Sequence, residues 1–196
     1  MNVDRRREIL LPEGAPDPGT FTQIVSAGDA TGDGQADFFV TVGDALWVLT
    51  GYNGATVDRA TRLSAASWAN RDVVTVQDIT GDGVTDLLYR TDETGRLLLR
   101  GGIKAASGGV DFASLATAAG SAGGGDTQYG ASGWSSGAVP FILGTPDANG
   151  DSVPDIWAVQ AGGSVRFHAG SRTALSGNDT EVVGAATWWK TRQAVG

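Results

Sequence analysis

Short stretches of alternating apolar and polar residues recur along the whole chain, and most of them come in pairs separated by a tight turn. They are rich in β-branched and aromatic residues, with Gly, Asp and Asn between them. This pattern predicts β-strands joined as hairpins. No stretch shows a convincing helical period, so we expect an all-β fold. The three clearest pairs are residues 37–42 with 46–51, 86–91 with 96–101, and 155–160 with 164–170.

An acidic loop precedes each of these pairs and follows one rule, D-x-[T/N]-G-D-[G/S]-x-x-D. It reads "GDATGDGQAD" at residues 28–37, "QDITGDGVTD" at 77–86 and "PDANGDSVPD" at 146–155. The first aspartates stand at positions 29, 78 and 147, which gives spacings of 49 and 69 residues. A motif that returns at such intervals indicates a repeat architecture.

Each repeat continues with two further strand-like runs and a tryptophan. Residues 60–66 follow the first hairpin, and residues 110–118 are their counterpart in the second repeat. A tryptophan then recurs, at Trp68, Trp134 and Trp189, and a last run leads into the next loop. Four short strands in roughly 50 residues are typical of one blade of a β-propeller. The sequence therefore predicts a β-propeller, or a propeller segment, of about four blades.

The whole chain, residues 1–196, is expected to form this single domain. Its repeats are placed at about residues 1–28 (partial), 29–77, 78–146 and 147–196. A glycine-rich insertion at 119–133 lengthens the second long repeat, and we expect it to be an exposed loop. Because unpaired strand edges invite aggregation, residues 9–12 and 22–27 are expected to complete the last sheet and close the ring.

The acidic loop points to a hard cation, because oxygen-bearing groups occupy alternate positions. Positions 1, 3, 5 and 9 carry such side chains, and position 7 can offer a backbone carbonyl. Ca²⁺ takes about 6–8 oxygen ligands, and glycines at positions 4 and 6 permit the tight turns that gather them. The candidate ligands are Asp29, Thr31, Asp33, Gln35 and Asp37; Asp78, Thr80, Asp82, Val84 and Asp86; and Asp147, Asn149, Asp151, Val153 and Asp155.

Up to three calcium ions are therefore expected, in loops that sit on hairpins. An EF-hand is excluded because it needs a glutamate at position 12 and flanking helices. Position 12 here is Val40, Tyr89 or Ala158, each inside a strand-like run. The alternative is a carboxylate-rich turn without an ion. That alternative is strongest for the third loop, where Ser152 replaces the glycine at position 6.

Composition removes several other classes of function. The chain has no cysteine and one histidine, so it carries neither a disulfide framework nor a thiolate zinc site. Its net charge of −8 argues against a nucleic-acid partner, since phosphate backbones attract basic proteins. Its apolar runs are too short for a transmembrane span.

The loops and their strands resemble FG-GAP/VCBS repeats, the calcium-binding blades of integrin alpha-subunit-like propellers, of the type in secreted actinobacterial proteins. The resemblance is carried by "GDATGDGQADFFV", "QDITGDGVTDLLY", the recurring tryptophan and the "LWVLTG" strand, and it covers about residues 20–196. The insertion and Ser152 depart from the pattern. The resemblance implies an extracellular propeller stabilised by calcium and used in adhesion, in carbohydrate binding or as a module of a secreted hydrolase.

No catalytic constellation is evident. The stretch "GWSSG" at 133–137 matches G-x-S-x-G, but a nucleophile elbow needs a strand–turn–helix context and a histidine partner. Here the motif ends a glycine-rich loop, and His168 follows a distant strand. The recurring tryptophans are expected to pack between blades, the alternative being aromatic platforms for sugars.

We therefore expect a secreted, non-enzymatic module that recognises a glycan or a protein partner on a cell surface. The alternative is a structural module that positions or completes a larger secreted protein such as a hydrolase. In that case a second chain or a neighbouring domain completes the ring.

Overall fold

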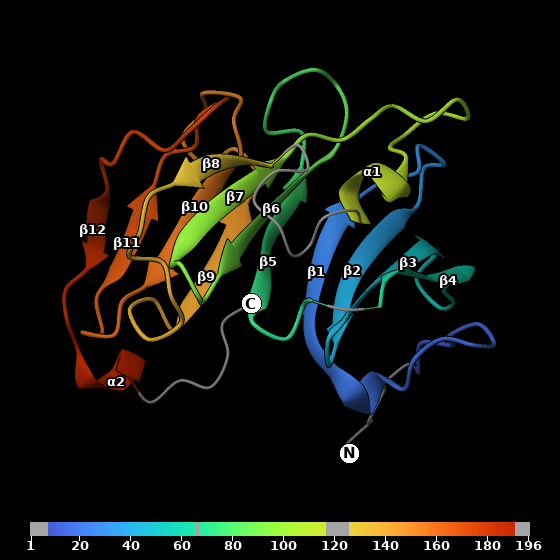
Figure 1. Ribbon diagram of the computed structural model, residues 1–196, viewed down its shortest axis with the longest axis horizontal. Helices are drawn as coiled ribbons and strands as arrows, with labels where there is room; N and C mark the ends of the chain where they lie inside the picture. The colour runs from blue at the N-terminus through green and yellow to red at the C-terminus, as the bar shows by residue number, and fades with distance from the viewer. Residues whose placement is uncertain (1–7, 66, 117–125, 191–196) are drawn as a thin grey trace, which may run out of the picture.

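The computed structural model describes residues 8–65, 67–116 and 126–190, and in them the chain forms three four-stranded antiparallel sheets (Figure 1). Each sheet is a meander in chain order, in which every strand pairs with its neighbours in sequence. Sheet one contains β1 (Phe21–Gly28), β2 (Ala36–Val42), β3 (Ala45–Tyr52) and β4 (Arg59–Ser64); sheet two contains β5 (Arg71–Gln77), β6 (Asp86–Thr91), β7 (Arg96–Arg100) and β8 (Asp126–Gly130); sheet three contains β9 (Phe141–Thr145), β10 (Asp155–Val159), β11 (Val165–His168) and β12 (Thr180–Val183).

Helices are few and short. They are η1 (Pro18–Thr20), α1 (Phe112–Ala116) and α2 (Thr187–Lys190). None of these described helices has the length and apolar character needed to cross a membrane. The all-β prediction is therefore confirmed.

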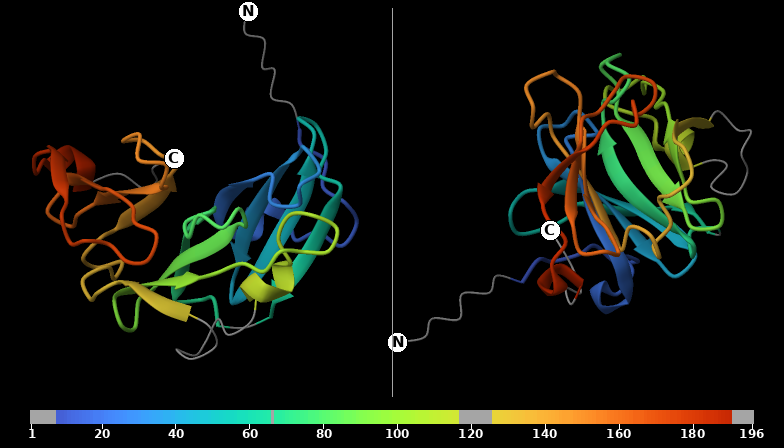
Figure 2. Two further views of the ribbon diagram at one scale, coloured as in Figure 1. Left: turned by 90° about the horizontal axis from the view of Figure 1, so that it is seen from above. Right: turned by 90° about the vertical axis from the view of Figure 1, so that its left-hand side faces the viewer.

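The three sheets follow one another along an arc (Figure 2). The first strands β1, β5 and β9 lie next to one another, and each sheet extends outward from its first strand. Sheets one and three form the two ends of the arc, and no strand pairs between them in the described part of the chain. The described residues thus contain three sheets of blade-like order and no closed ring.

The predicted ring closure is wrong. We expected residues 22–27 to complete the last sheet, but β1 pairs with β2 along its length, with Ile24 opposite Val40. Leu10, from the other expected segment, forms a parallel bridge with Thr56, also in the first part of the chain. In every sheet the strand before the acidic loop pairs with the hairpin that follows the loop. Each sheet therefore begins one strand earlier than the repeat boundary expected from the sequence.

The second sheet corrects two further expectations. Residues 110–118 were expected to form a strand, whereas α1 occupies part of them. The insertion at 119–133 was expected to be a loop, but β8 lies within it and pairs with β7; residues 119–125 fall outside the described residues. A buried network explains the ordering of β8: Arg100 donates to both carboxylate oxygens of Asp126, which also accepts the hydroxyl of Tyr89 at 2.7 Å.

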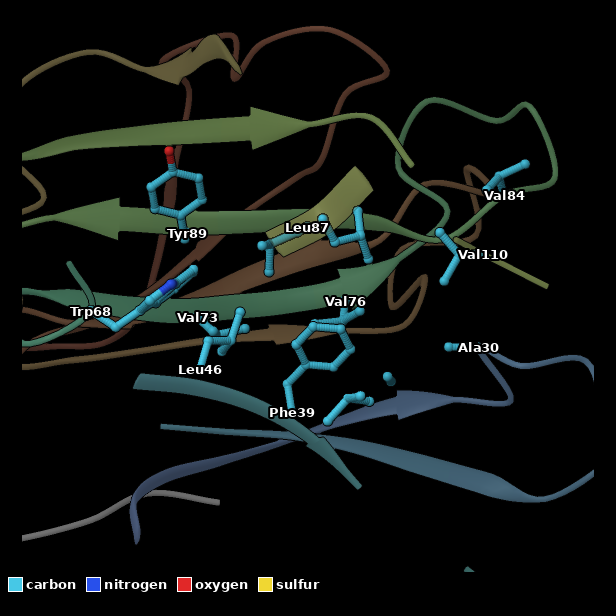
Figure 3. Packing of buried hydrophobic residues seen from close by; sticks show 13 residues of the cluster. Ala30, Phe39, Leu46, Trp68, Val73, Val76, Val84, Leu87, Tyr89 and Val110 are labelled. Carbon is cyan, nitrogen blue, oxygen red and sulfur yellow. The ribbon is translucent and has the colours of Figure 1, made fainter. Parts of the chain in front are cut away.

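The main core lies between sheets one and two (Figure 3). Successive residues of β2 point to opposite faces, so Phe39 enters this core while its neighbour Val40 packs on the outer face of sheet one. Trp68, which follows β4, is 1% exposed and lies 5.6 Å from the ring of Tyr89 on β6. Its amide donates to Asp44 Oδ1 in the β2–β3 turn, so the turn fixes the tryptophan between the two sheets.

A second core lies between sheets two and three. It contains Leu88 and Leu97 from sheet two and Ile156 and Ala158 from β10, with Trp134 packed against it. Trp134 is held as Trp68 is, since its amide donates to the carbonyl of Gly95 in the turn before β7. Two of the three recurring tryptophans therefore pack between sheets, as predicted.

Trp68 is expected to be a main support of the sheet one–sheet two contact. Trp68→Ala should lower the free energy of unfolding by about 3–5 kcal/mol, because it leaves a cavity among buried side chains. The matched control is Trp188→Ala, whose ring is 54% exposed and which should change stability by less than about 1 kcal/mol. Urea denaturation of both variants, followed by circular dichroism, measures the difference. Equal losses in the two variants would contradict this packing role.

Candidate metal centres in three repeated loops

Each acidic loop joins the first strand of a sheet to the second. Loop one spans residues 29–37, loop two 78–86 and loop three 147–155, at the β1–β2, β5–β6 and β9–β10 connections. The structure therefore places the fifteen predicted ligands at equivalent positions of three sheets. The side chains at positions 1, 5 and 9 have distinct surroundings that repeat from loop to loop.

The aspartate at position 1 holds the backbone of the loop in its curve. In loop one, Asp29 Oδ1 accepts from the amides of Gly32 and Asp33 at 2.8 and 2.9 Å, and Oδ2 accepts from Gly34 at 2.8 Å. Asp147 makes the same three bonds in loop three, and Asp78 makes the first and last of them in loop two. These bonds lower the pKa values of Asp29 and Asp147, chiefly through the amides of Gly34 and Ser152.

Positions 4, 5 and 6 complete this turn. The aspartate at position 5 accepts the amide of position 7 at 2.8–2.9 Å in all three loops, so the residues expected to offer carbonyls are held through their amides. Position 6 has positive φ throughout, with 84° at Gly34, 81° at Gly83 and 66° at Ser152. Loop three thus keeps the geometry of the others although serine replaces glycine.

The aspartate at position 9 is different, because it is buried. Asp37, Asp86 and Asp155 are each 0% exposed. Asp86 accepts amides of Ile79 and Thr80 from its own loop and of Gly102 from beyond β7, at 2.8–3.0 Å. The carboxylate therefore clips the loop to the end of the third strand. Burial raises the pKa values of Asp37 and Asp86 above the usual range.

The same clip recurs in the other sheets. Asp37 accepts from Thr31 at 2.8 Å and from Gly51 at 3.0 Å, and Asp155 accepts from Ala148 and Gly170, both at 2.8 Å. The ligand prediction had assigned these aspartates to a cation alone. The structure gives them a second role as acceptors for backbone amides of the loop and of the glycine at the end of the third strand.

Three glycines on the other side of the clip were missed by sequence reasoning. Gly51 lies near the end of the third strand of its sheet, Gly102 and Gly170 follow the third strands of theirs, and all three donate to the buried aspartates. A Cβ on Gly102 would stand 2.1 Å from the carbonyl oxygen of Thr85, and one on Gly170 would stand 1.9 Å from that of Pro154. The signal was present as the glycine that ends "LWVLTG", "RLLLRGG" and "SVRFHAG".

The donor set fits a hard cation in chemistry. Positions 1, 3, 5 and 9 carry side-chain oxygens in every loop, and the hydroxyl of Thr80, at position 3, is buried without a hydrogen-bond partner among the described residues. In the described ranges no three acidic or histidine side chains converge as a ready-made metal centre. Binding would therefore turn carboxylates such as Asp82, which uses only Oδ1 in the loop, toward a common point.

Contacts between sheets also reach the loops. The guanidinium of Arg172, from sheet three's last connection, donates to the carbonyl of Ile79 in loop two at 3.3 Å and to that of Ser152 in loop three at 2.9 Å. Loop one is met by Val110, whose amide donates to the carbonyl of Ala30 at 2.9 Å. Changes in one loop are thus coupled to the packing of the next sheet.

The G-x-S-x-G match does not assemble a serine–histidine pair in the described residues. The backbone carbonyl of Ser135 accepts the amides of Ala138 and Val139, and His168 Nε2 has no hydrogen-bond partner. His168 instead lies 4.8 Å from the ring of Trp134.

Comparison with known proteins adds no assignment. A scan against protein-family models gives no match, and a search of curated proteins gives none.

Loop three should gain stability from Ser152→Gly. A serine at φ 66° is strained by its Cβ, and glycine removes that strain. We expect a gain of up to about 1 kcal/mol in the free energy of unfolding. The control is Ser107→Gly, at an exposed residue outside the left-handed region, which should lower stability through the added freedom of the unfolded chain. A loss at both positions, measured by urea denaturation, would show that Ser152 is not strained.

Proposed function

We propose that the chain is a β-propeller segment that serves as a secreted, non-enzymatic binding module, stabilised by up to three calcium ions. The observation that carries the proposal is the threefold recurrence of one acidic loop with the same hydrogen bonds at the same connection of three sheets. The backbone hydrogen bonds need only an acceptor at these positions, whereas a carboxylate at positions 1, 5 and 9 of every copy also gives each loop the charge that a divalent cation requires. Recognition of a glycan or another cell-surface partner is the function we assign to it.

Calcium has a definite energetic role in this proposal. Each loop brings three carboxylates into nine residues, and their mutual repulsion opposes the native turn. An ion that binds only the native state stabilises it by RT ln(1 + [L]/Kd), or about 2.7 kcal/mol per site when free calcium exceeds Kd a hundredfold. Three sites would rival the whole stability of an ordinary domain, about 5–15 kcal/mol. The ion performs no chemistry.

Calcium should therefore raise the melting temperature of the chain relative to chelator, and more than magnesium does. Asp82→Ala should remove part of this gain while changing the melt in chelator little, because Asp82 is exposed and accepts one amide. Asp86→Ala should lower stability in calcium and in chelator alike, by about 3 kcal/mol or more, since it leaves three buried amides without an acceptor. Differential scanning calorimetry of the three proteins provides the comparison.

Two results would each contradict one part of this account, the first the binding of calcium and the second the backbone role of Asp86. Identical melts of the unmutated chain in calcium and in chelator would remove calcium from the proposal. A loss of stability in Asp86→Ala only when calcium is present would mean that the buried carboxylate acts through the ion rather than through the backbone.

The scaffold alternative is favoured by the outer face of sheet one. An apolar pocket of about 210 Å³ lies there, lined by Ile9, Phe21, Ile24, Phe38 and Tyr52 among others. Ile24 is 62% exposed, which is unusual for a side chain of a regular strand unless another surface covers it. In this alternative a second chain or a neighbouring domain packs on the ends of the arc and completes the ring. Sedimentation of the isolated chain distinguishes the two partners. A stable dimer would indicate that a second chain completes the ring, and a monomer would leave that role to a neighbouring domain.

Binding to a glycan array separates the two functions. The recognition function predicts robust binding that soluble sugar competes away and that persists for as long as the chain stays folded. The scaffold function predicts no glycan binding, together with capture of a neighbouring domain of the parent protein. Asp82→Ala serves as a control here, because binding should fall only as far as the folded fraction of the chain falls. Absence of binding to every glycan would exclude sugar recognition.

A further inference from the structure

A cavity of about 310 Å³ opens at the junction of sheets two and three, away from the acidic loops. Its wall on the sheet two side is the segment after β8, including Gly130 and Trp134. Its wall on the sheet three side contains Gln160 after β10, His168 at the end of β11 and Asp179 before β12. Neither the calcium proposal nor the core packing uses these polar groups.

His168 is the most unusual group in the wall. The side chain is 7% exposed, and its Nε2 has no hydrogen-bond partner among the described residues. A buried polar atom without a partner is destabilising by about 1–3 kcal/mol, so such atoms in native structures need an explanation. Burial lowers the pKa of His168, which favours the neutral imidazole.

Trp134 supplies an aromatic wall beside the histidine. The two ring centroids are 4.8 Å apart, with the planes inclined at 60°. The indole nitrogen packs closely over Gly130, where a Cβ would stand 2.8 Å from Nε1. The backbone amide donates to Gly95 and the carbonyl accepts from Arg90, so the residue is anchored at both sides of its Cα. The wall is thus a fixed surface rather than a mobile side chain.

The remaining polar groups set the charge of the ligand. Asp179 Oδ1 accepts from Arg166 at 2.5 Å, and the same guanidinium donates to Glu181 at 3.3 Å, so this cation is shared by two carboxylates and the wall offers none to an anionic ligand. Within the described residues, the side-chain amide of Gln160 makes no hydrogen bond, so its donor and acceptor are both available. The cavity thus combines an aromatic wall with an amide, a paired carboxylate and a neutral imidazole. Such a lining suits a ligand that has both hydroxyls and apolar C–H faces.

We propose that this cavity binds one pyranose ring of a neutral glycan, with the ring on Trp134 and its hydroxyls toward Gln160, Asp179 and His168. The inference rests on the proposed recognition function and names its site. Small-molecule pockets span about 300–1,000 Å³, so a cavity of this size holds a single ring at the end of a glycan. The site is independent of the three acidic loops, so calcium acts on it only through the stability of the fold.

The test uses the full chain in calcium with methyl glycosides of glucose, galactose, mannose and N-acetylglucosamine. Saturation-transfer NMR identifies the glycoside that binds, and titration of ¹⁵N spectra gives its Kd. We expect the indole signal of Trp134 to shift. Gln160→Ala should weaken binding by about tenfold, the equivalent of one lost hydrogen bond to the ligand. Gln128→Ala, at an exposed glutamine on β8, should leave Kd unchanged. Trp134→Phe keeps an aromatic ring for folding and should also weaken binding.

The outcomes distinguish failure of the cavity assignment from failure of the recognition function. If a glycan binds and Gln160→Ala and Trp134→Phe leave Kd unchanged while their melting temperatures match the parent chain, the cavity assignment is wrong and sugar recognition stands. If neither the glycosides nor the array gives binding, sugar recognition fails and the cavity assignment fails with it.

Discussion

The buried aspartate at position 9 of each loop is the interaction on which the rest of the structure depends. Asp37, Asp86 and Asp155 each join the turn after the first strand to a glycine at or just beyond the end of the third. A charged group at 0% exposure would be strongly destabilising without partners, and the converging amides provide them. Each sheet is thereby closed at one end by a hydrogen-bonded carboxylate, and in sheets two and three the glycine must lack a Cβ because a backbone carbonyl stands in its place.

The contacts between sheets follow from this internal order. Once each sheet is held, its second-to-third-strand turn presents backbone acceptors that fix a tryptophan against the next sheet. Trp68 fills the junction of sheets one and two with Tyr89, and Trp134 lies at the junction of sheets two and three with His168. Trp68 packs among buried side chains at the first junction, and a cavity with polar walls opens beside Trp134 at the second. The cavity and the polar groups in its walls are the basis for assigning a ligand to the second junction.

The loops combine two electrostatic roles that use different aspartates. The exposed carboxylates at positions 1 and 5 shape the turn and have oxygens that a cation can recruit, while the buried one serves the backbone. The hydroxyl of Thr80 is buried and has no hydrogen-bond partner among the described residues, so loop two is where a cation would most favourably gain an oxygen ligand. On this view calcium adds to a turn that the chain already forms, so it supports stability without creating the fold.

Local chemistry determined the strands and the loops in advance. Alternation of apolar and polar residues predicts the hairpins, and the spacing of Asp and Gly predicts turns with positive φ, because both depend on neighbours in sequence. Tertiary structure decided three further features: which strand pairs with each first strand, the strand at Asp126–Gly130, and the open arc. A strand pairs according to which edge is available, and β8 is ordered by Arg100 and Tyr89, which lie 26 and 37 residues away. The burial of Asp86 and the isolation of His168 Nε2 likewise depend on packing between distant segments, which no local pattern contains.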